Sequence, residues 1–145
     1  MCGIAGFWFK DSAPESARKW LRDGAASLHH RGPDDSGLWF DGAVGLGHTR
    51  LSILDLSPLG RQPMASRDGR WVMAFNGEVY NFREIRKDLE RLNHSFVGTS
   101  DSEVVIEAFA EWGPAAVRRF IGMFAIALWA KADRKLYLLR DRLGV

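Results

Sequence analysis

Cysteine is nearly missing from this sequence: Cys2 is the only one among 145 residues. A single cysteine excludes an intrachain disulfide. The four histidines have no cysteine partners and no His-Glu-x-x-His spacing, so the sequence contains no metal-binding motif. We therefore expect no metal site and no disulfide, and a fold that depends on its hydrophobic core.

Long hydrophobic runs and an excess of one charge are also absent. No apolar stretch reaches the roughly 18–20 residues that cross a bilayer, and the N-terminus lacks the basic region and apolar stretch of a signal peptide. Twenty Lys and Arg residues stand against 18 Asp and Glu residues, without a basic block. This balance gives no support to nucleic-acid or membrane-surface binding. We expect a cytoplasmic protein with neither kind of partner.

The hydrophobic content is 46%, which in a chain of this length is enough for one domain with a buried core. Apolar patterns predict strands at 4–8, 38–40, 44–50, 71–75, 123–129 and 136–139. The last two would form an antiparallel hairpin, which argues against a doubly wound parallel sheet. The pattern favours a layered α/β architecture with helices on the outer faces.

Two segments have the form of a helix-capping box. The first is Ser12-Ala13-Pro14-Glu15, which predicts a helix whose buried face carries Ala17, Trp20, Leu21, Ala25 and Leu28. The second is Ser100-Asp101-Ser102-Glu103, which predicts a helix through Trp112. A further helix is expected from Asn81.

Cys2 occupies an unusual position because removal of Met1 would make it the first residue. It would then carry both a thiol and a free α-amine, whose pKa of roughly 7.7–8 leaves it partly unprotonated at neutral pH. A thiol beside such an amine is a nucleophile with its own base. Gly3 would leave space for a substrate carbonyl beside the sulfur. The alternative is that Cys2 is a small buried hydrophobic residue.

Three other positions each allow a structural and a functional interpretation. Arg50, at the end of a strand, is either a solvated arginine or a two-point clamp for a carboxylate. Asn76-Gly77 is either a tight turn or a pair of oxyanion donors. Asp101 is either a favourable acid at a helix start or the partner of a ligand's ammonium group.

The polar segment from His29 to Gly37 is either a loop or part of a polar site held by its Gly-Pro turn. Taken together, these segments resemble the glutaminase domain of class II glutamine amidotransferases, which are N-terminal-nucleophile hydrolases, and within them the glutamine-hydrolysing asparagine synthetase type. The matching segments occur in the same order along nearly the whole chain. They are 2–6 (CGIAG), 30–34 (HRGPD), 50–55 (RLSILD) with 62–63 (QP), 75–81 (FNGEVYN), 100–103 (SDSE) and 140–144 (RDRLG).

The resemblance implies two stacked antiparallel sheets between helical layers, and it implies roles for single residues. Cys2 would attack the side-chain amide carbon of glutamine while its α-amine takes up the thiol proton. Asn76 and the N–H of Gly77 would hold the oxyanion. Water would then hydrolyse the thioester, releasing glutamate after ammonia.

Substrate recognition is implied in the same way. Arg50 would clamp the α-carboxylate of glutamine and Asp101 would receive its α-ammonium group. Ile53 and Glu78 would line the pocket. Arg31 and Asp34 would support the terminal strand, whereas His48 is expected to pack rather than react.

The resemblance also predicts what this chain lacks. The family pattern continues into further strands, so residues 1–145 are expected to be a truncated glutaminase domain whose open sheet edge could lead to a homo-oligomer. The synthetase domain that would use ATP and Mg²⁺ and receive the ammonia is expected elsewhere, and the glutaminase domain itself needs no cofactor. A non-catalytic glutamine-binding or structural module, inactive through truncation or a retained Met1, is the alternative. The ammonia acceptor, aspartate or another carboxylate, is not defined.

Overall fold

The computed structural model describes residues 2–52 and 58–144. Its strands are β1 (Gly3–Trp8), β2 (Asp35–Asp41), β3 (Val44–Arg50), β4 (Met64–Ala65), β5 (Trp71–Val79), β6 (Gly122–Ala130) and β7 (Lys135–Arg140). Its α-helices are α1 (Ser16–Ser27), α2 (Phe82–Arg91) and α3 (Asp101–Trp112), and short 3₁₀ turns occupy His29–Arg31, Pro58–Gly60 and Gly113–Arg119. None of the helices in the described ranges is long and apolar enough to cross a membrane.

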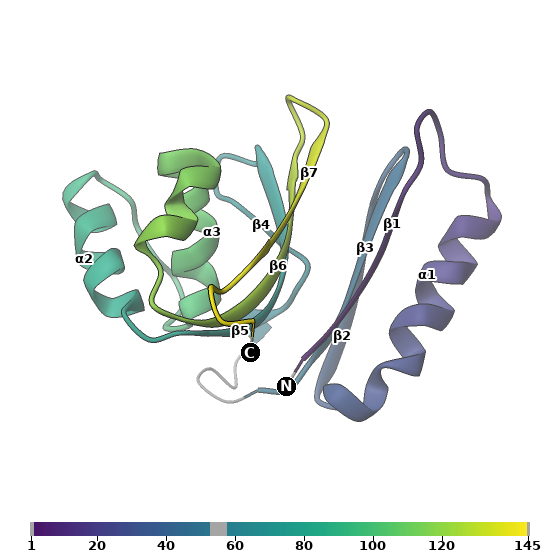
Figure 1. Cartoon of the computed structure of the whole chain (residues 1–145), viewed down its shortest axis with the longest axis horizontal. Helices are drawn as coiled ribbons and strands as arrows, with labels where there is room; N and C mark the ends of the chain where they lie inside the picture. The colour runs from purple at the N-terminus through teal and green to yellow at the C-terminus, as the bar shows by residue number, and fades with distance from the viewer. Residues whose placement is uncertain (1, 53–57, 145) are drawn as a thin grey trace.

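The strands form two antiparallel sheets that stack face to face (Figure 1). The first has the order β1-β3-β2 and the second the order β4-β5-β6-β7. Helix α1 covers the outer face of the first sheet, and α2 and α3 cover the outer face of the second. The expected α/β sandwich between helical layers is therefore confirmed.

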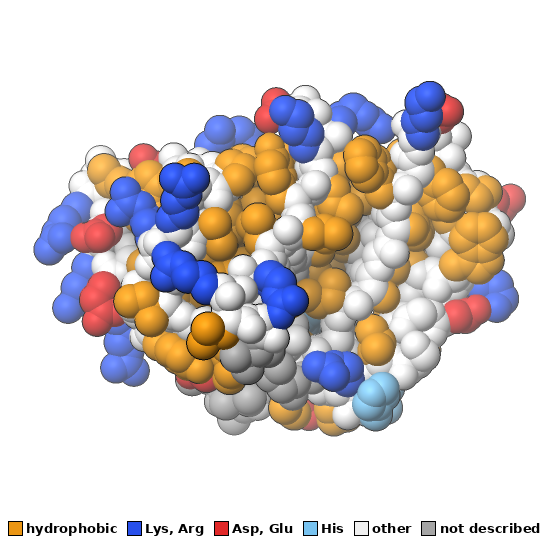
Figure 2. Space-filling model, viewed as in Figure 1, with side chains coloured by type: hydrophobic (Ala, Val, Ile, Leu, Met, Phe, Trp, Pro, Cys, Tyr) orange, Lys and Arg blue, Asp and Glu red, His pale blue; other side chains and the backbone are white. Residues whose placement is uncertain are grey.

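The central strand β6 has apolar side chains on both faces, as its sequence predicted. Phe124, Ile126 and Leu128 belong to the core shared with α3, whereas Ala127 and Trp129 lie in the core between the two sheets. The two sides of one strand thus join the two cores. Figure 2 shows hydrophobic side chains gathered along both sheets on one face of the molecule, with Lys and Arg side chains around them.

The two capping predictions have different outcomes. At α3 the prediction is correct, because Ser100 Oγ accepts a hydrogen bond from the Glu103 N–H at 3.3 Å. At α1 it is wrong: the helix begins at Ser16, and the N-cap residue Glu15 makes no side-chain capping bond. Trp20 is also 55% exposed instead of lying on the buried face.

Strand β5 extends past the predicted end at Phe75. Asn76, Gly77 and Glu78 pair in unbroken register with β6, opposite Ala125, Phe124 and Met123. The tight-turn interpretation of Asn76-Gly77 is therefore wrong. Pairing with β6 outweighs the local turn preference, and it keeps both residues on a fixed strand.

Candidate active site

Cys2 lies directly before β1, whose first pairing joins Gly3 to Thr49 of β3. Its Sγ is half-buried and accepts a hydrogen bond from the backbone N–H of Leu51 at 3.4 Å. The guanidinium of Arg31 donates to the Cys2 carbonyl at 3.1 Å. The thiol is therefore held at the end of a paired strand and not on a frayed terminus.

The space left by the missing side chain of Gly3 is filled by neighbouring residues and is not free for a substrate. A Cβ at this position would lie 2.6 Å from Thr49 Oγ1 and 2.8 Å from Leu28 Cβ. Those side chains already occupy the space that the glycine leaves. Gly3 therefore allows β1 to pack against β3 and the end of α1, and the expectation that it makes room for a substrate carbonyl is wrong.

Asp34 fixes the backbone that faces the thiol. Its N–H donates to the Arg50 carbonyl at 3.0 Å, and its carboxylate accepts from the Ser52 N–H at 2.7 Å. Leu51, whose N–H points at the sulfur, lies between those two anchors. Of the two predicted supporting residues, Arg31 thus contacts the backbone of Cys2 and Asp34 contacts the residues on either side of Leu51.

Arg50 ends β3 and is only 8% exposed. Any side chain at Gly60 would collide with its guanidinium, so the 3₁₀ turn at Pro58–Gly60 closes over this arginine. Its position, buried at the same end of β3 as the thiol, suits a clamp better than a solvated surface role. Ile53, the predicted pocket residue, lies outside the described residues.

Asn76 and Gly77 lie on β5 in the facing sheet. Asn76 Oδ1 is buried, and no described residue hydrogen-bonds to it. Gly77 has φ +151°, a conformation that side-chain-bearing residues rarely adopt. A Cβ there would lie 2.6 Å from the Cα of Phe124. The position accepts glycine alone.

The direction of the Gly77 N–H follows from the residues on either side of it. Phe75 directs both of its backbone groups away from β6: its N–H donates to Gln62 Oε1 at 2.6 Å and its carbonyl accepts from His48 Nε2 at 3.0 Å. Backbone groups alternate between the two edges of a strand, so Asn76 bonds toward β6 and the Gly77 N–H points to the open edge. Accordingly Phe124, opposite Gly77, exchanges its backbone bonds with Asp141 instead.

The Asp101 carboxylate lies at the same edge of β5, next to Val79, two residues after Gly77. Its carboxylate accepts the Val79 N–H at 3.0 Å and is 5% exposed. Burial raises the pKa of Asp101, and the neighbouring charge of Glu78 adds to the rise, while hydrogen bonds from the backbone N–H groups of Val79 and Ser102 offset part of it. A cationic group bound here would favour the ionised carboxylate.

The strands that carry the two groups of residues lie next to each other: β5 packs against both β1 and β3, and His48 of β3 hydrogen-bonds to the Phe75 carbonyl of β5. The first sheet contributes Cys2 and Arg50, and the second contributes Asn76 and Gly77, with Asp101 reaching over from α3. A thiol, a buried cation, a buried carboxylate and an open backbone N–H are the groups required to bind an amino acid and attack its side chain.

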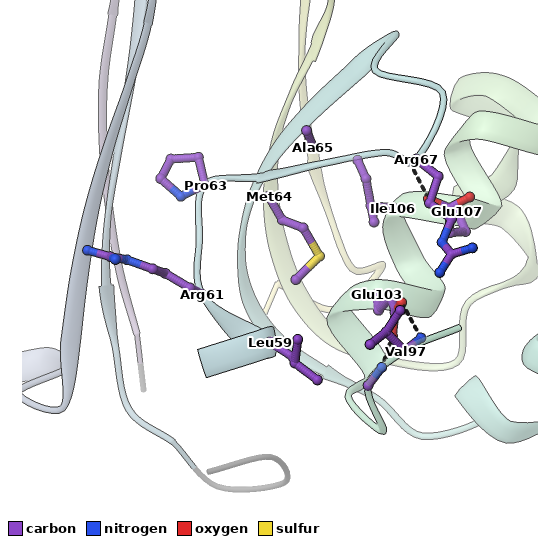
Figure 3. A pocket seen from close by; sticks show the side chains of 11 residues that line it. Leu59, Arg61, Pro63, Met64, Ala65, Arg67, Val97, Glu103, Ile106 and Glu107 are labelled. Atoms are coloured by element: carbon purple, nitrogen blue, oxygen red, sulfur yellow. Dashed lines mark hydrogen bonds between the residues drawn. The ribbon is translucent and has the colours of Figure 1, made fainter. Parts of the chain in front are cut away.

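A separate pocket of about 470 Å³ lies between β4 and α3 (Figure 3). Met64, Pro63 and Ile106 form its apolar wall, and its two carboxylates already accept backbone hydrogen bonds, Glu103 from Val97 and Gly98 and Glu107 from Arg67. None of the predicted site residues within the described ranges lines it. This pocket is distinct from the candidate active site.

Comparison with known proteins decides the family. A glutamine amidotransferase domain model matches residues 1–145, the whole chain. The chain belongs to the glutamine amidotransferase domain family. Within it the domain is of the class II, asparagine synthetase type.

Two curated relatives show the extent of the similarity. "Asparagine synthetase [glutamine-hydrolyzing] 2" of Bacillus subtilis is 43% identical and is matched over 100% of this chain and 19% of its own length. "Amidase chry2" of Gibberella zeae is 36% identical, with 100% and 23% covered. This chain thus spans about a fifth of the length of these relatives.

A solved structure supports the fold independently. The glutamine phosphoribosylpyrophosphate amidotransferase of B. subtilis superposes with a TM-score of 0.78 over 99% of this chain and 38% of its own, at 19% identity. The N-terminal-nucleophile hydrolase fold expected from the sequence is therefore confirmed.

Sequence reasoning missed two residues of this amidotransferase domain that the structure places next to the site. Gln62 was noted only as part of a motif, and His48 was expected to pack. Both are buried, and both hydrogen-bond to Phe75, the residue before Asn76. The available sequence signal is His48 within the predicted strand 44–50, because a buried polar side chain needs a partner.

Proposed function

We propose that this domain hydrolyses the side-chain amide of glutamine to glutamate and ammonia through a thioester on Cys2. The observation that carries the proposal is the open Gly77 N–H, held by β5 on the sheet that faces the thiol. Acyl transfer requires a nucleophile and a fixed oxyanion donor on either side of the reacting carbonyl. Catalysis further requires that Met1 be removed, because the nitrogen of Cys2 is otherwise an amide without basicity.

Glutamine would bind through its two charges. The guanidinium of Arg50 would take the α-carboxylate in a two-point contact, and Asp101 would receive the α-ammonium group with Glu78 beside it. Opposite charges on the two sides of the pocket orient the amino acid, so that its side-chain amide extends toward the sulfur. Ile53 would complete the pocket wall.

The chemistry then proceeds in two halves. The α-amine of Cys2 takes the thiol proton as sulfur attacks the amide carbon, and the Gly77 N–H and Asn76 amide stabilise the oxyanion. The protonated amine gives its proton to the departing nitrogen, so ammonia leaves and a thioester remains. Water attacks the thioester with the amine again as base, and collapse of the second oxyanion restores the thiol and releases glutamate.

The ammonia would pass to an ATP-dependent, Mg²⁺-dependent amide-forming synthetase portion. The name of the Bacillus relative suggests aspartate as its acceptor, whereas the name of the Gibberella relative, an amidase, suggests that related domains serve other reactions. Residues 1–145 all match the glutamine amidotransferase domain model, which carries the proposed glutaminase half. The identity of the acceptor would depend on the synthetase portion.

The test is the intact mass of the chain after incubation with a diazo-ketone analogue of glutamine, together with glutamate release. Because Cys2 is the only cysteine, one adduct on a Met1-free chain identifies the nucleophile without peptide mapping. Cys2→Ala should release no glutamate while it still binds glutamine, and Arg50→Ala should raise the glutamine concentration needed for half-saturation. Equal glutamate release by wild type and Cys2→Ala would exclude the proposed enzyme, as would the absence of any adduct on the Met1-free chain.

A further inference from the structure

The peptide groups of Phe75 are held by two buried side chains. Gln62 Oε1 accepts the Phe75 N–H at 2.6 Å, and His48 Nε2 donates to the Phe75 carbonyl at 3.0 Å. Gln62 is 5% exposed and His48 1% exposed. Together these contacts replace the two ladder hydrogen bonds that a neighbouring strand would otherwise provide.

The side chains are needed because the neighbouring strand ends early. β4 pairs only Met64 and Ala65 with β5, opposite Met73 and Val72. Pro63 has no N–H to continue the ladder. The backbone of Gln62 lies instead against β2, where any side chain at Gly37 would collide with the Gln62 carbonyl. β5 therefore passes Phe75 with no strand on this side.

His48 is a neutral donor in this arrangement. The pKa of His48 is lowered to about 4, mainly by burial and also by the charge of Arg50, while the Phe75 carbonyl and Asp35 oppose the decrease. A neutral ring has one N–H, and the carbonyl contact assigns it to Nε2. Nδ1 is then the unprotonated nitrogen, and no described residue hydrogen-bonds to it.

His48 also connects the two halves of the site. It lies on β3 two residues before Arg50 and pairs with Ile4 of β1, the strand that follows Cys2. The hydrogen bond from its Nε2 to the Phe75 carbonyl fixes the position of β5 relative to β1. Gln62 holds the preceding peptide group, through the Phe75 N–H, at the same edge of β5. A displacement of β5 by 1 Å would move the Gly77 N–H out of reach of the oxyanion.

We propose that His48 and Gln62 are positioning residues that hold the two backbone groups of Phe75 so that the Gly77 N–H faces the reacting carbonyl. The inference rests on the glutaminase proposal and extends it to two side chains that touch neither substrate nor sulfur. Because the oxyanion exists only in the transition state, these residues should act on kcat and leave the KM for glutamine nearly unchanged.

The test compares His48→Leu, Gln62→Leu and His48→Gln in the full chain. Each Leu variant should lower kcat, and the rate of labelling by the diazo-ketone, by about ten- to a hundredfold at similar KM. His48→Gln restores an amide donor near the Nε2 position and should recover most of that loss. Leu variants that keep wild-type kcat would overturn the proposal, and Gln62→Leu serves this purpose if His48→Leu does not fold.

Ser66→Ala is the matched control. Ser66 Oγ is buried and accepts the Trp71 N–H at 3.1 Å, so it holds the same edge of β5 at the strand's far end. Its loss should lower the melting temperature as the Leu variants do, yet leave kcat unchanged. An equal fall in kcat for Ser66→Ala would show that kcat falls because the protein is generally less stable. That result would refute the positioning role.

A second measurement separates this inference from the proposed function. If the wild-type chain neither turns over glutamine nor takes the label, the glutaminase proposal fails, and the backbone amide resonance of Gly77 still tests the positioning. That resonance should shift in both Leu variants and stay in place in Ser66→Ala. An unshifted Gly77 amide in the Leu variants would contradict the proposal whether or not the chain is active.

Discussion

The carboxylate of Asp34 accepts the backbone N–H of Ser52 at 2.7 Å while the Asp34 N–H donates to the carbonyl of Arg50 at 3.0 Å. This one residue holds the chain on both sides of Leu51, whose N–H contacts the Cys2 sulfur at 3.4 Å. The environment of the sulfur therefore depends on a side chain that does not touch it.

Asp34→Ala should slow labelling of Cys2 by the diazo-ketone several-fold and cost about 0.5–1.5 kcal/mol of unfolding free energy, because one side-chain hydrogen bond is lost. Asp34→Asn keeps an acceptor oxygen and should stay close to wild type. Labelling kinetics and urea unfolding provide both numbers. Indistinguishable labelling rates for Ala and wild type would show that the Leu51 backbone holds its position without Asp34.

Gly77→Ala should be among the most damaging single changes in the chain. The added Cβ meets the backbone of Phe124, and the φ of +151° is unfavourable for alanine. We expect a loss of more than about 2 kcal/mol in unfolding free energy together with loss of labelling. Gly42→Ala is the control, because Gly42 also has positive φ, +57°, with nothing within 4 Å. If the two variants lose equal stability, the close approach at Gly77 is unimportant.

Asp101→Asn should abolish glutamine binding and raise the melting temperature. Burial raises the pKa of Asp101 in the folded protein. Its contribution therefore favours folding at low pH and is lost as pH rises through the folded pKa. Asparagine keeps an oxygen for the Val79 N–H without the buried charge, so the melting temperature at pH 7.5 should rise by about 2–5 °C. Glutamine binding, measured by calorimetry, should disappear.

Glu103→Gln is the contrasting control for Asp101→Asn. It lies in the same helical turn, but its carboxylate accepts two backbone N–H groups, from Val97 and Gly98. Removal of that charge should lower the melting temperature. A fall in melting temperature for Asp101→Asn as well would mean that the charged form of Asp101 is stabilising.

His94 should make the stability of the α3 layer depend on pH. Its ring lies between two carboxylates, with Nδ1 3.0 Å from Glu107 and Nε2 3.0 Å from Glu111. Burial alone would lower the pKa of His94, but the hydrogen bonds to Glu111 and Glu107 outweigh it and raise the pKa. The stabilisation is therefore complete below about pH 6.5 and is lost as pH rises through the folded pKa.

Melting curves between pH 5.5 and 8.5 test this prediction. His94→Gln should flatten the decrease in melting temperature at the alkaline end, whereas replacement of the exposed His29 by Gln should leave it unchanged. A wild-type melting temperature that does not fall across this range would disprove the coupling of His94 to the two carboxylates.

Local sequence rules predicted the elements whose signals agree with their tertiary setting. The Ser100 cap formed because the residues before it fold back onto Glu103, and β6 was recognisable because both of its faces are apolar. At Ser12 the same capping pattern failed, because Pro14 and Glu15 begin the helix by backbone bonding alone.

The site could be predicted from ordered motifs, but its geometry could not. Asn76-Gly77 has a turn preference that only the pairing with β6 overrides, and that pairing joins segments about fifty residues apart. The partners of Phe75 are set by where β4 ends and by the register of β3, neither of which is a local property. The roles of the motif residues themselves remain predictions for the experiments above.

The two-residue length of β4 has a consequence for how such a site is built. Residues 75, 77 and 79 form a row along the edge of β5, spaced by roughly 6.8 Å, the two-residue repeat of a strand. Gln62 and His48 fill the first place in the row and Asp101 fills the third. Under the proposed mechanism, the middle place, at Gly77, would receive the substrate carbonyl oxygen when it becomes negatively charged. A β4 extended by a few residues would occupy that place permanently, so the proposed oxyanion site depends on where β4 ends.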